Sequence, residues 1–207
     1  MKLSFHTVGL DHHPLPEIIR RVAAAGYDGI ELGCEDIPWA PPAITPATPV
    51  SEQEDLARQC RKANLPVSAI GGHVPMLGPD AASRRAAIDF VNGCTDMAVR
   101  FGASVNHILS GPKPEGMSDD EAFAVFADAV AQTTEYATSQ GVALAIEGVF
   151  ANAFRRPGDY RRLAQELPDV PWKVNYDPSH LIVHDEDPYA FLEEFGDRVA
   201  HVHLKDG

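Results

Sequence analysis

Short apolar segments alternate with longer amphipathic segments along the whole chain of 207 residues. A short apolar run bounded by turn residues predicts a buried strand, and an apolar face that recurs every three or four residues predicts a helix. The predicted strands are Lys2–Thr7, Asp28–Gly33, Pro66–Gly72, Ser104–Ser110, Val142–Val149, Trp172–Asp177 and Val199–Lys205. A strand and its following helix repeat about every 29 residues, and such β-α units predict a parallel sheet covered by helices.

The helices predicted between these strands have recognisable ends. Pro157 and Pro188 suit the first turn of a helix, where the missing backbone N–H costs nothing. Three glycines stand shortly before a strand, where a left-handed residue ends a helix: Gly26, Gly102 and Gly141. The predicted helices are Leu15–Ala25, Ser51–Ala63, Ala81–Phe101, Asp119–Ser139, Pro157–Leu167 and Pro188–Phe195.

Repeated β-α units form either an open doubly wound sheet or a closed barrel. No GxGxxG or GxxxxGK[ST] motif follows a predicted strand, so a nucleotide-binding open sheet has no support. Polar residues instead recur at the carboxyl ends of the strands, where barrel enzymes build their active sites. We therefore expect a single α/β domain over residues 1–207, a (β/α)8-type TIM barrel that is truncated after strand seven and lacks the eighth unit.

Composition excludes several classes of partner. The formal net charge of −13 repels a phosphate backbone, which argues against nucleic acid. No apolar run approaches the roughly 20 residues of a membrane span, and the N-terminus has no secretory signal. The cysteines Cys34, Cys60 and Cys94 are odd in number and form no CxxC pair, so we expect buried thiols and a cytoplasmic protein.

Side-chain alternation predicts which polar groups enter the barrel. Residues on one strand face alternate sides, and the apolar side should meet the helices. The inward side chains are then Glu147 on the fifth predicted strand, Lys173, Asn175 and Asp177 on the sixth, and His201, His203 and Lys205 on the seventh. Buried charges are costly unless they are paired or bind a metal, so three such strands suggest a functional site.

Three of these residues lie one β-α unit apart. Glu147, Asp177 and His203 are separated by 30 and 26 positions, which predicts neighbouring side chains at one height of the barrel. Carboxylate and imidazole groups together suit Mn²⁺, Mg²⁺, Co²⁺ or Zn²⁺. An internal salt-bridge network that satisfies itself is the alternative interpretation.

A family resemblance appears in these segments. The run NYDPSHL (175–181), the pair DP (187–188) and the run GDRVAHVHLKD (196–206) resemble the sugar phosphate isomerase/epimerase family with the xylose-isomerase-like TIM barrel. AIEG (145–148) and YDGIELG (27–33) are similar to the fifth and second strands of that family. The resemblance runs in order along the chain, and its carboxyl-terminal third is the most specific part.

The resemblance implies roles for individual residues. Glu147, Asp177 and His203 match three family metal ligands, and Mn²⁺ is the cation we expect first. A fourth ligand, a glutamate on strand eight that also serves in acid/base catalysis, has no counterpart here. Glu147 would then be both ligand and catalytic acid or base. His180 matches a histidine that contacts a substrate oxygen, although a capped loop residue is the alternative.

Further residues are candidates for substrate binding. His73 follows the third predicted strand and could line the pocket, while His107 could do the same or be a satisfied core histidine. Lys205 could touch substrate or pair with a carboxylate. We interpret Glu31, inward on strand two, as structural, with an acid that faces the substrate as the alternative.

Two loops could also contribute to the site. The proline-rich segment Glu35–Val50 could cover the substrate with Ile37 and Trp39, or be an ordinary packed loop. Arg155 and Arg156 follow the fifth predicted strand and could meet an anionic substrate, or be solvated.

The expected activity is isomerisation or epimerisation of a small sugar or keto-polyol, by proton transfer next to a carbonyl through a metal-stabilised enediolate. A dehydratase of the inosose dehydratase type is one alternative, and an inactive barrel fragment is another. The abasic-site endonucleases share the barrel and resemble the chain at Asp177, His180 and His203. They fit least, because LSG (109–111) replaces a required HPG motif and the charge opposes DNA. Unpaired edge strands could also promote homo-oligomers.

Overall fold

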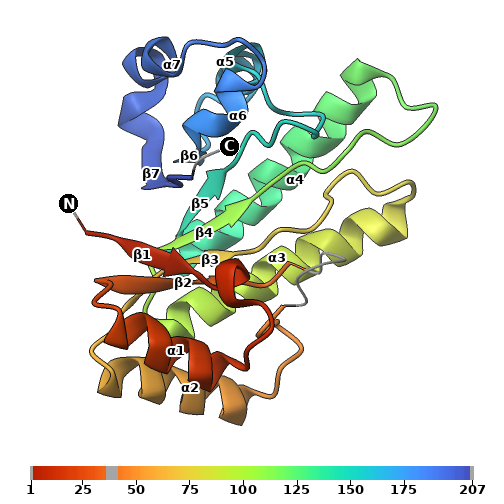
Figure 1. The fold of residues 1–207 in the computed structure, drawn as a ribbon. Coiled ribbons are helices and arrows are strands. Elements are labelled where there is room, and N and C mark those ends of the chain that lie inside the picture. Colours follow the sequence, from red (N-terminus) through yellow and green to blue (C-terminus); the bar gives the residue numbers. More distant parts are fainter. Residues whose placement is uncertain (1, 36–41, 206–207) are drawn as a thin grey trace.

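Seven parallel strands form one sheet in the computed structural model, which describes residues 2–35 and 42–205 (Figure 1). The strands pair in chain order, each with its sequence neighbour. They are β1 (Ser4–His6), β2 (Gly29–Gly33), β3 (Val67–Gly71), β4 (Val105–Ile108), β5 (Ala143–Ile146), β6 (Lys173–Tyr176) and β7 (Val199–Val202). This order confirms the predicted succession of β-α units.

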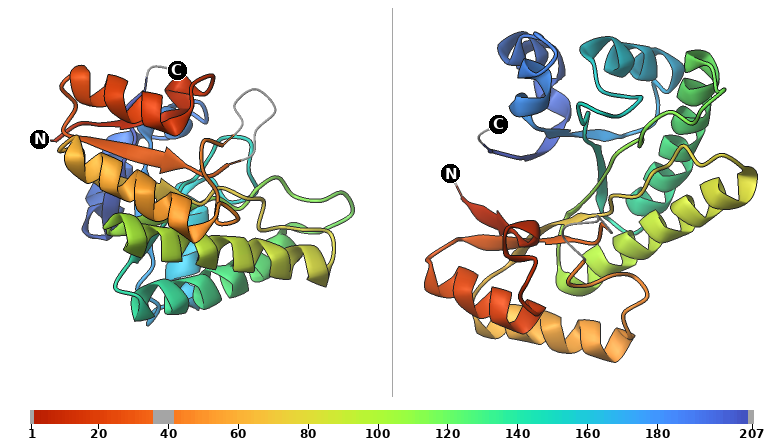
Figure 2. Two further views of the ribbon diagram at one scale, coloured as in Figure 1. Left: turned by 90° about the horizontal axis from the view of Figure 1, so that it is seen from below. Right: turned by 45° about the vertical axis from the view of Figure 1, so that its right-hand side comes forward.

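The sheet curls, and the long helices lie on its convex side (Figure 2). Among the described residues β1 and β7 are the two edges of the sheet, so the architecture is a curled half-barrel. The helices are α1 (Leu15–Ala24), α2 (Val50–Lys62), α3 (Ala81–Phe101), α4 (Asp119–Ser139), α5 (Pro157–Glu166), α6 (Pro178–Ile182) and α7 (Pro188–Phe195), with 3-10 turns η1 (Thr7–Leu10) and η2 (Gly196–Arg198).

The helix ends follow the expected local chemistry. The side chain of Ser118 caps α4 by accepting the backbone N–H of Glu121. The carboxylate of Glu121 in turn accepts the backbone N–H of Ser118. Gly26, Gly102 and Gly141 have φ angles of 82°, 75° and 74°, which confirms their place at helix ends. The predicted and observed bounds of α3, α4 and α7 are the same.

The strands are shorter than predicted at their carboxyl ends. Glu147, Asp177 and His203 lie just beyond the ends of β5, β6 and β7. The backbone N–H groups of Glu147 and His203 still donate to the carbonyl oxygens of Ile108 and Tyr176 on the neighbouring strands. Asp177 accepts the N–H of Ser179 and begins the short helix α6, which was not predicted.

The main core fills the space between the sheet and the helices. Ile30 and Leu32 of β2 point into it, as do the fully buried Trp172 and Phe126. Asn106 of β4 also faces this side, because its Nδ2 donates to the Val91 carbonyl of α3. The neighbouring His107 must therefore face the inside of the half-barrel, which settles its orientation.

The concave side has two layers. Small buried side chains from three adjacent strands, Ala69, Val105 and Ala145, form a separate apolar cluster. Two residues further along two of these strands are His107 and Glu147, so the charged groups lie at the carboxyl ends above an apolar base.

The outer side of β7 differs from the expectation. Val202 and Leu204 face away from the inside as predicted, but they are 45% and 67% exposed, so no described helix covers them. The three cysteines are buried free thiols, as predicted. No helix among the described residues is both long enough and apolar enough to cross a membrane.

Candidate functional site

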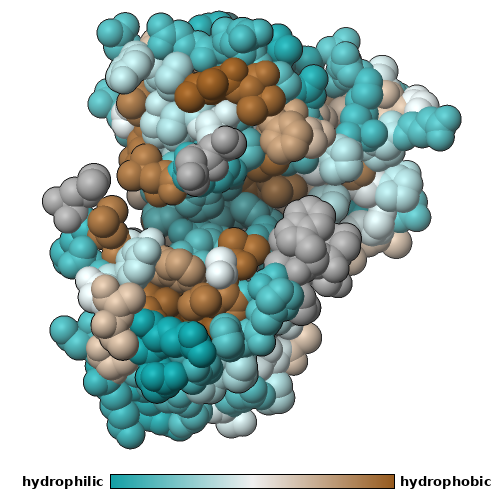
Figure 3. Space-filling view, viewed as in Figure 1, coloured by the Kyte–Doolittle hydropathy of each residue, from teal (hydrophilic) through white to brown (hydrophobic). Residues whose placement is uncertain are grey.

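Ionisable side chains gather inside the curl of the sheet. The space-filling view shows a hollow with a hydrophilic floor in the middle of the face (Figure 3). Six of the nine histidines of the chain contact acidic groups there: His6, His73, His107, His180, His201 and His203, against Glu31, Glu35, Glu147 and Asp177. This concentration of imidazole and carboxylate groups marks the candidate site.

Glu147, Asp177 and His203 come together as the strand spacing predicted. Each offers an atom that could bind a metal, and these atoms lie within 4.8 Å of one another. Glu147 is only 3% exposed, and its Oε2 accepts a bond of 2.9 Å from Asn175 Nδ2. Asp177 Oδ1 accepts two bonds from Ser179, so that Oδ2 remains for another partner.

His180 and Lys205 lie against the same carboxylates. His180 Nε2 is 3.3 Å from Glu147 Oε1, and Lys205 Nζ is 2.9 Å from Asp177 Oδ2 and 3.0 Å from His180 Nε2. The ring of Phe150 lies 5.7 Å from that of His180, between centroids. The ion pair of Lys205 with a carboxylate was one of the two expected alternatives.

A second group that could hold a metal shares Glu147. His73 and His107 complete it, from the ends of β3 and β4. His73 Nε2 lies 2.8 Å from His107 Nδ1, and His73 Nδ1 lies 2.6 Å from Glu35 Oε2. His73 and His107 were candidates for lining the pocket, with a core position as the alternative for His107. Their convergence on Glu147 was not predicted.

Glu31 contacts more histidines than its position in the sequence predicted. Its carboxylate is buried and lies 2.6 Å from His107 Nε2, 2.8 Å from His201 Nε2 and 2.9 Å from His203 Nε2. His6 Nε2 is 3.4 Å away. Two features could have indicated this: the inward position of Glu31 on β2, and the alternating histidines of β7, which need an acidic partner inside the barrel.

The pKa values show how the histidines and carboxylates of the site balance one another's charge. Burial alone would raise the pKa of Glu31 and Glu147, but histidine contacts outweigh it and hold both pKa values well below their usual range. Burial would lower the pKa of His73 and His203, yet hydrogen bonds to the carboxylates raise each to about 10. Burial prevails at His107, whose pKa falls to about 4. Protonated His73 and His203 thus supply the positive charge that buried carboxylates require.

Some of the residues singled out in the sequence do not line this site in the described structure. Ile37 and Trp39, expected over the substrate, lie outside the described residues. The side chain of His12 is 85% exposed, so this histidine lies in solvent rather than in the site. Arg155 and Arg156 line a separate cavity between α4 and α5.

The family can now be stated from a direct match. A profile described as the xylose isomerase-like TIM barrel matches residues 19–207 of the chain. The chain belongs to this family. This confirms the resemblance noted in the strands and turns of the sequence.

Individual relatives are distant. Fructoselysine 3-epimerase of Escherichia coli O157:H7 is 22% identical over 220 residues, covering 100% of this chain and 76% of that protein. The chain resembles the structure of 3-keto-D-glucoside 4-epimerase from E. coli, with a TM-score of 0.80, 16% identity and coverage of 100% and 79%. It also resembles the IolI protein with a bound zinc atom, with a TM-score of 0.79, 16% identity and coverage of 100% and 73%. At these identities the structural similarity shows the fold alone.

The charge balance predicts how stability depends on pH without a cation. Folding raises the pKa of His73 and His203 from 6.5 to about 10, so their contribution is complete below pH 6.5 and is lost as the pH rises toward 10. In EDTA, urea titrations should show the free energy of unfolding falling over this range, by at most about 1.4 kcal/mol per pH unit for each histidine. The exposed-site control His12→Gln should keep this slope, and the double variant His73→Gln/His203→Gln should flatten it. A stability that stays level or rises from pH 6.5 to 10 in the parent chain would contradict the charge assignment.

Proposed function

We propose that the chain is a metal-dependent epimerase or isomerase of a small sugar or keto-polyol. The observation that carries the proposal is the convergence of Glu147, Asp177 and His203 within 4.8 Å at the carboxyl ends of three adjacent strands. Catalytic groups of TIM-barrel enzymes occupy this end of the barrel. The sugar epimerases among its relatives support the proposed reaction class.

The donor set fits a divalent cation. Two carboxylates and one imidazole suit Mn²⁺, and also Mg²⁺, Co²⁺ or Zn²⁺. Both carboxylates are buried. Histidine contacts hold the pKa of Glu147 well below its usual range, and Lys205 pairs with Asp177. When bound, such a cation polarises the carbonyl of the substrate and stabilises the negative charge that develops beside it.

The residues of the chain then divide the remaining work. Glu147 is ionised, as a group that accepts a proton from carbon must be. His180 and Lys205 present their Nε2 and Nζ atoms beside the two carboxylates, where they bind and orient substrate oxygens. His73 and His107 line the adjoining side of the pocket.

Glu31 acts through His203 in this proposal. The bond between Glu31 Oε1 and His203 Nε2 leaves Nδ1, which lies 3.3 Å from Glu147 Oε2, as the nitrogen that would hold the cation. A carboxylate behind a ligating histidine fixes both the tautomer and the orientation of the ring. Glu31 is thus a positioning residue rather than a catalytic one.

The second metal-capable group favours one other candidate function. His73, His107 and Glu147 adjoin the first group through a shared carboxylate, which is the arrangement that two-metal hydrolysis of phosphate esters uses. The net charge of −13 opposes a nucleic acid substrate. Binding of two Mn²⁺ ions together with cleavage of phosphate esters would support this alternative, and binding of one ion would oppose it.

The proposed function predicts a proton-transfer activity that can be measured. In D₂O with Mn²⁺, the chain should exchange a carbon-bound proton beside the carbonyl of D-fructose, D-psicose, D-tagatose or fructoselysine, followed by NMR. Glu147→Gln should lower the exchange rate about 100-fold or more, because the amide cannot accept the proton. The exposed-residue control Glu193→Gln should exchange normally. Exchange in Glu147→Gln at the parent rate would refute the role of Glu147, and no exchange of any of these sugars by the parent chain would refute the substrate class.

The positioning role of Glu31 predicts a change in metal affinity. Calorimetric titration should show that Glu31→Gln binds Mn²⁺ roughly 10- to 100-fold more weakly than the parent chain, because the amide no longer fixes His203. Glu54→Gln, an exposed glutamate on α2, is the matched control and should bind normally. Circular dichroism checks that the variants are folded. Equal Mn²⁺ affinity in a folded Glu31→Gln would rule out the positioning role, whereas no binding by the parent chain would refute the proposed function itself.

A further inference from the structure

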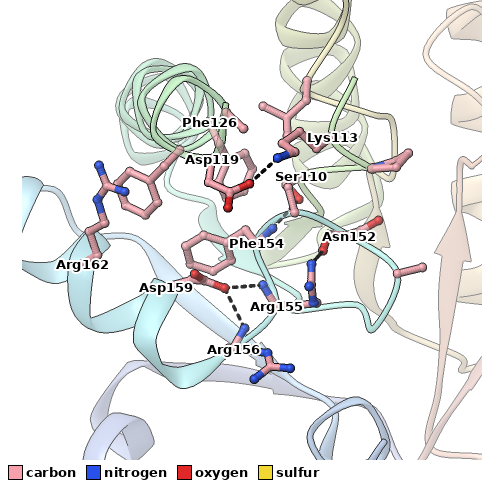
Figure 4. A pocket seen from close by; sticks show the side chains of 16 residues that line it. Ser110, Lys113, Asp119, Phe126, Asn152, Phe154, Arg155, Arg156, Asp159 and Arg162 are labelled. Carbon is pink, nitrogen blue, oxygen red and sulfur yellow. Dashed lines mark hydrogen bonds and ion pairs between the residues drawn. The ribbon is translucent and has the colours of Figure 1, made fainter. Parts of the chain in front are cut away.

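A second cavity lies outside the histidine-rich site. It has a volume of about 560 Å³ and lies between the N-terminal ends of α4 and α5 (Figure 4). The loops that follow β4 and β5 form much of its wall, and its lining includes none of the ionisable residues of the hollow described above. The polar side chains that line it include Lys113, Asp119, Asn152, Arg155, Asp159 and Arg162.

The acidic groups of this cavity already have partners. Asp159 Oδ2 accepts the backbone N–H groups of Arg155 and Arg156, at 2.9 and 2.8 Å, at the start of α5. Asp119 is paired with Lys113. Both carboxylates of the cavity thus already have hydrogen-bond or ion-pair partners within its wall.

Arg155 is the unpaired cation of the cavity. Its Nη1 donates to the carbonyl oxygen of Asn152 at 2.5 Å, and in the described part of the chain no carboxylate oxygen lies within 4.0 Å of its guanidinium nitrogens. By contrast, Arg162 on the far wall lies 2.8 Å from Asp120 and 2.9 Å from Glu166. A half-buried guanidinium without a counter-ion favours an anion.

Two buried donors in the same wall have no acceptor. Arg155 Nε and Asn152 Nδ2 are both inaccessible to solvent and unbonded within the described residues, and Asn152 is 6% exposed. Buried polar groups in native proteins almost always have a hydrogen-bond partner, so we expect each of these two donors to bind an acceptor. Two donors and one positive charge, all from one loop, match the acceptor atoms of an oxyanion.

Aromatic side chains form another part of the cavity wall. Phe123, Phe126 and Phe154 line it, and the rings of Phe126 and Phe154 lie 5.0 Å apart between centroids. Figure 4 draws Phe126 and Phe154 among the side chains around the cavity. An occupant of this cavity is therefore expected to carry an apolar body beside its charged group.

We propose that this cavity binds a small organic oxyanion, a carboxylate or phosphate attached to an apolar body, through Arg155 and Asn152. The site is separate from the Glu147 centre but adjoins it. Gly148 follows Glu147 directly, and a Cβ there would lie 3.0 Å from the carbonyl oxygen of Arg155. The loop that carries Asn152 and Arg155 therefore packs closely against the residue that follows Glu147.

Titration with simple probes tests the proposal. Phenyl phosphate, benzoate, inorganic phosphate and uncharged benzyl alcohol are titrated into the whole chain by NMR, with EDTA present so that no cation-bound phosphate contributes. Phenyl phosphate or benzoate should bind saturably and more tightly than inorganic phosphate, and benzyl alcohol should not bind. The comparison of phenyl phosphate with benzoate identifies which oxyanion the cavity prefers.

Variants show whether the binding occurs in this cavity. Arg155→Gln and Asn152→Ala should each weaken the binding of the better probe roughly tenfold or more, because each removes a bond to a charged group. Arg20→Gln, an exposed arginine of α1, should bind like the parent chain. No saturable binding of either organic anion, or unchanged binding in Asn152→Ala and Arg155→Gln, overturns the proposal. If Arg155→Gln does not fold, the parent chain and Asn152→Ala decide it.

Discussion

The arrangement of the candidate site depends on the hydrogen bonds between the buried carboxylate of Glu31 and the histidines around it. A charge in the interior is tolerated only with close partners of opposite charge or strong donors. Glu31 on β2 finds them on β4 and β7, through His107, His201 and His203. These bonds cross the inside of the curled sheet, since β2 and β7 are not neighbours in it. They hold His203 where it also faces Glu147.

The two sides of the sheet have different roles. Apolar side chains on the convex side pack against the helices and provide the core, so that the concave side is available for charged groups. The small residues Ala69, Val105 and Ala145 form the apolar base beneath those groups. Without a cation, the protonated histidines His73 and His203 compensate the carboxylates. A bound divalent cation would displace this positive charge and occupy the place that the carboxylates create.

Local patterns predicted much of this structure, but interactions distant in sequence were beyond them. Strand alternation and the repeat of β-α units predicted that Glu147, Asp177 and His203 would meet, because both follow from backbone geometry. The contacts of Glu31 with β7 join residues 170 and 172 positions apart, and no local pattern reports how far a sheet curls. The orphaned donor of Asn152 was equally hidden, since it depends on how one loop folds. The proposed roles of individual residues rest on the family resemblance.

Anomalous diffraction from crystals of the chain grown with Mn²⁺ tests the central claim most directly. Data at the manganese absorption edge locate the cation without any assumption about its ligands. The account predicts one strong peak about 2.0–2.4 Å from a carboxylate oxygen of Glu147, an oxygen of Asp177 and Nδ1 of His203. The same peak should be missing in crystals of Asp177→Ala. A peak bound only by Glu31, His201 and His203, or no peak at all in the parent crystals, would contradict the account.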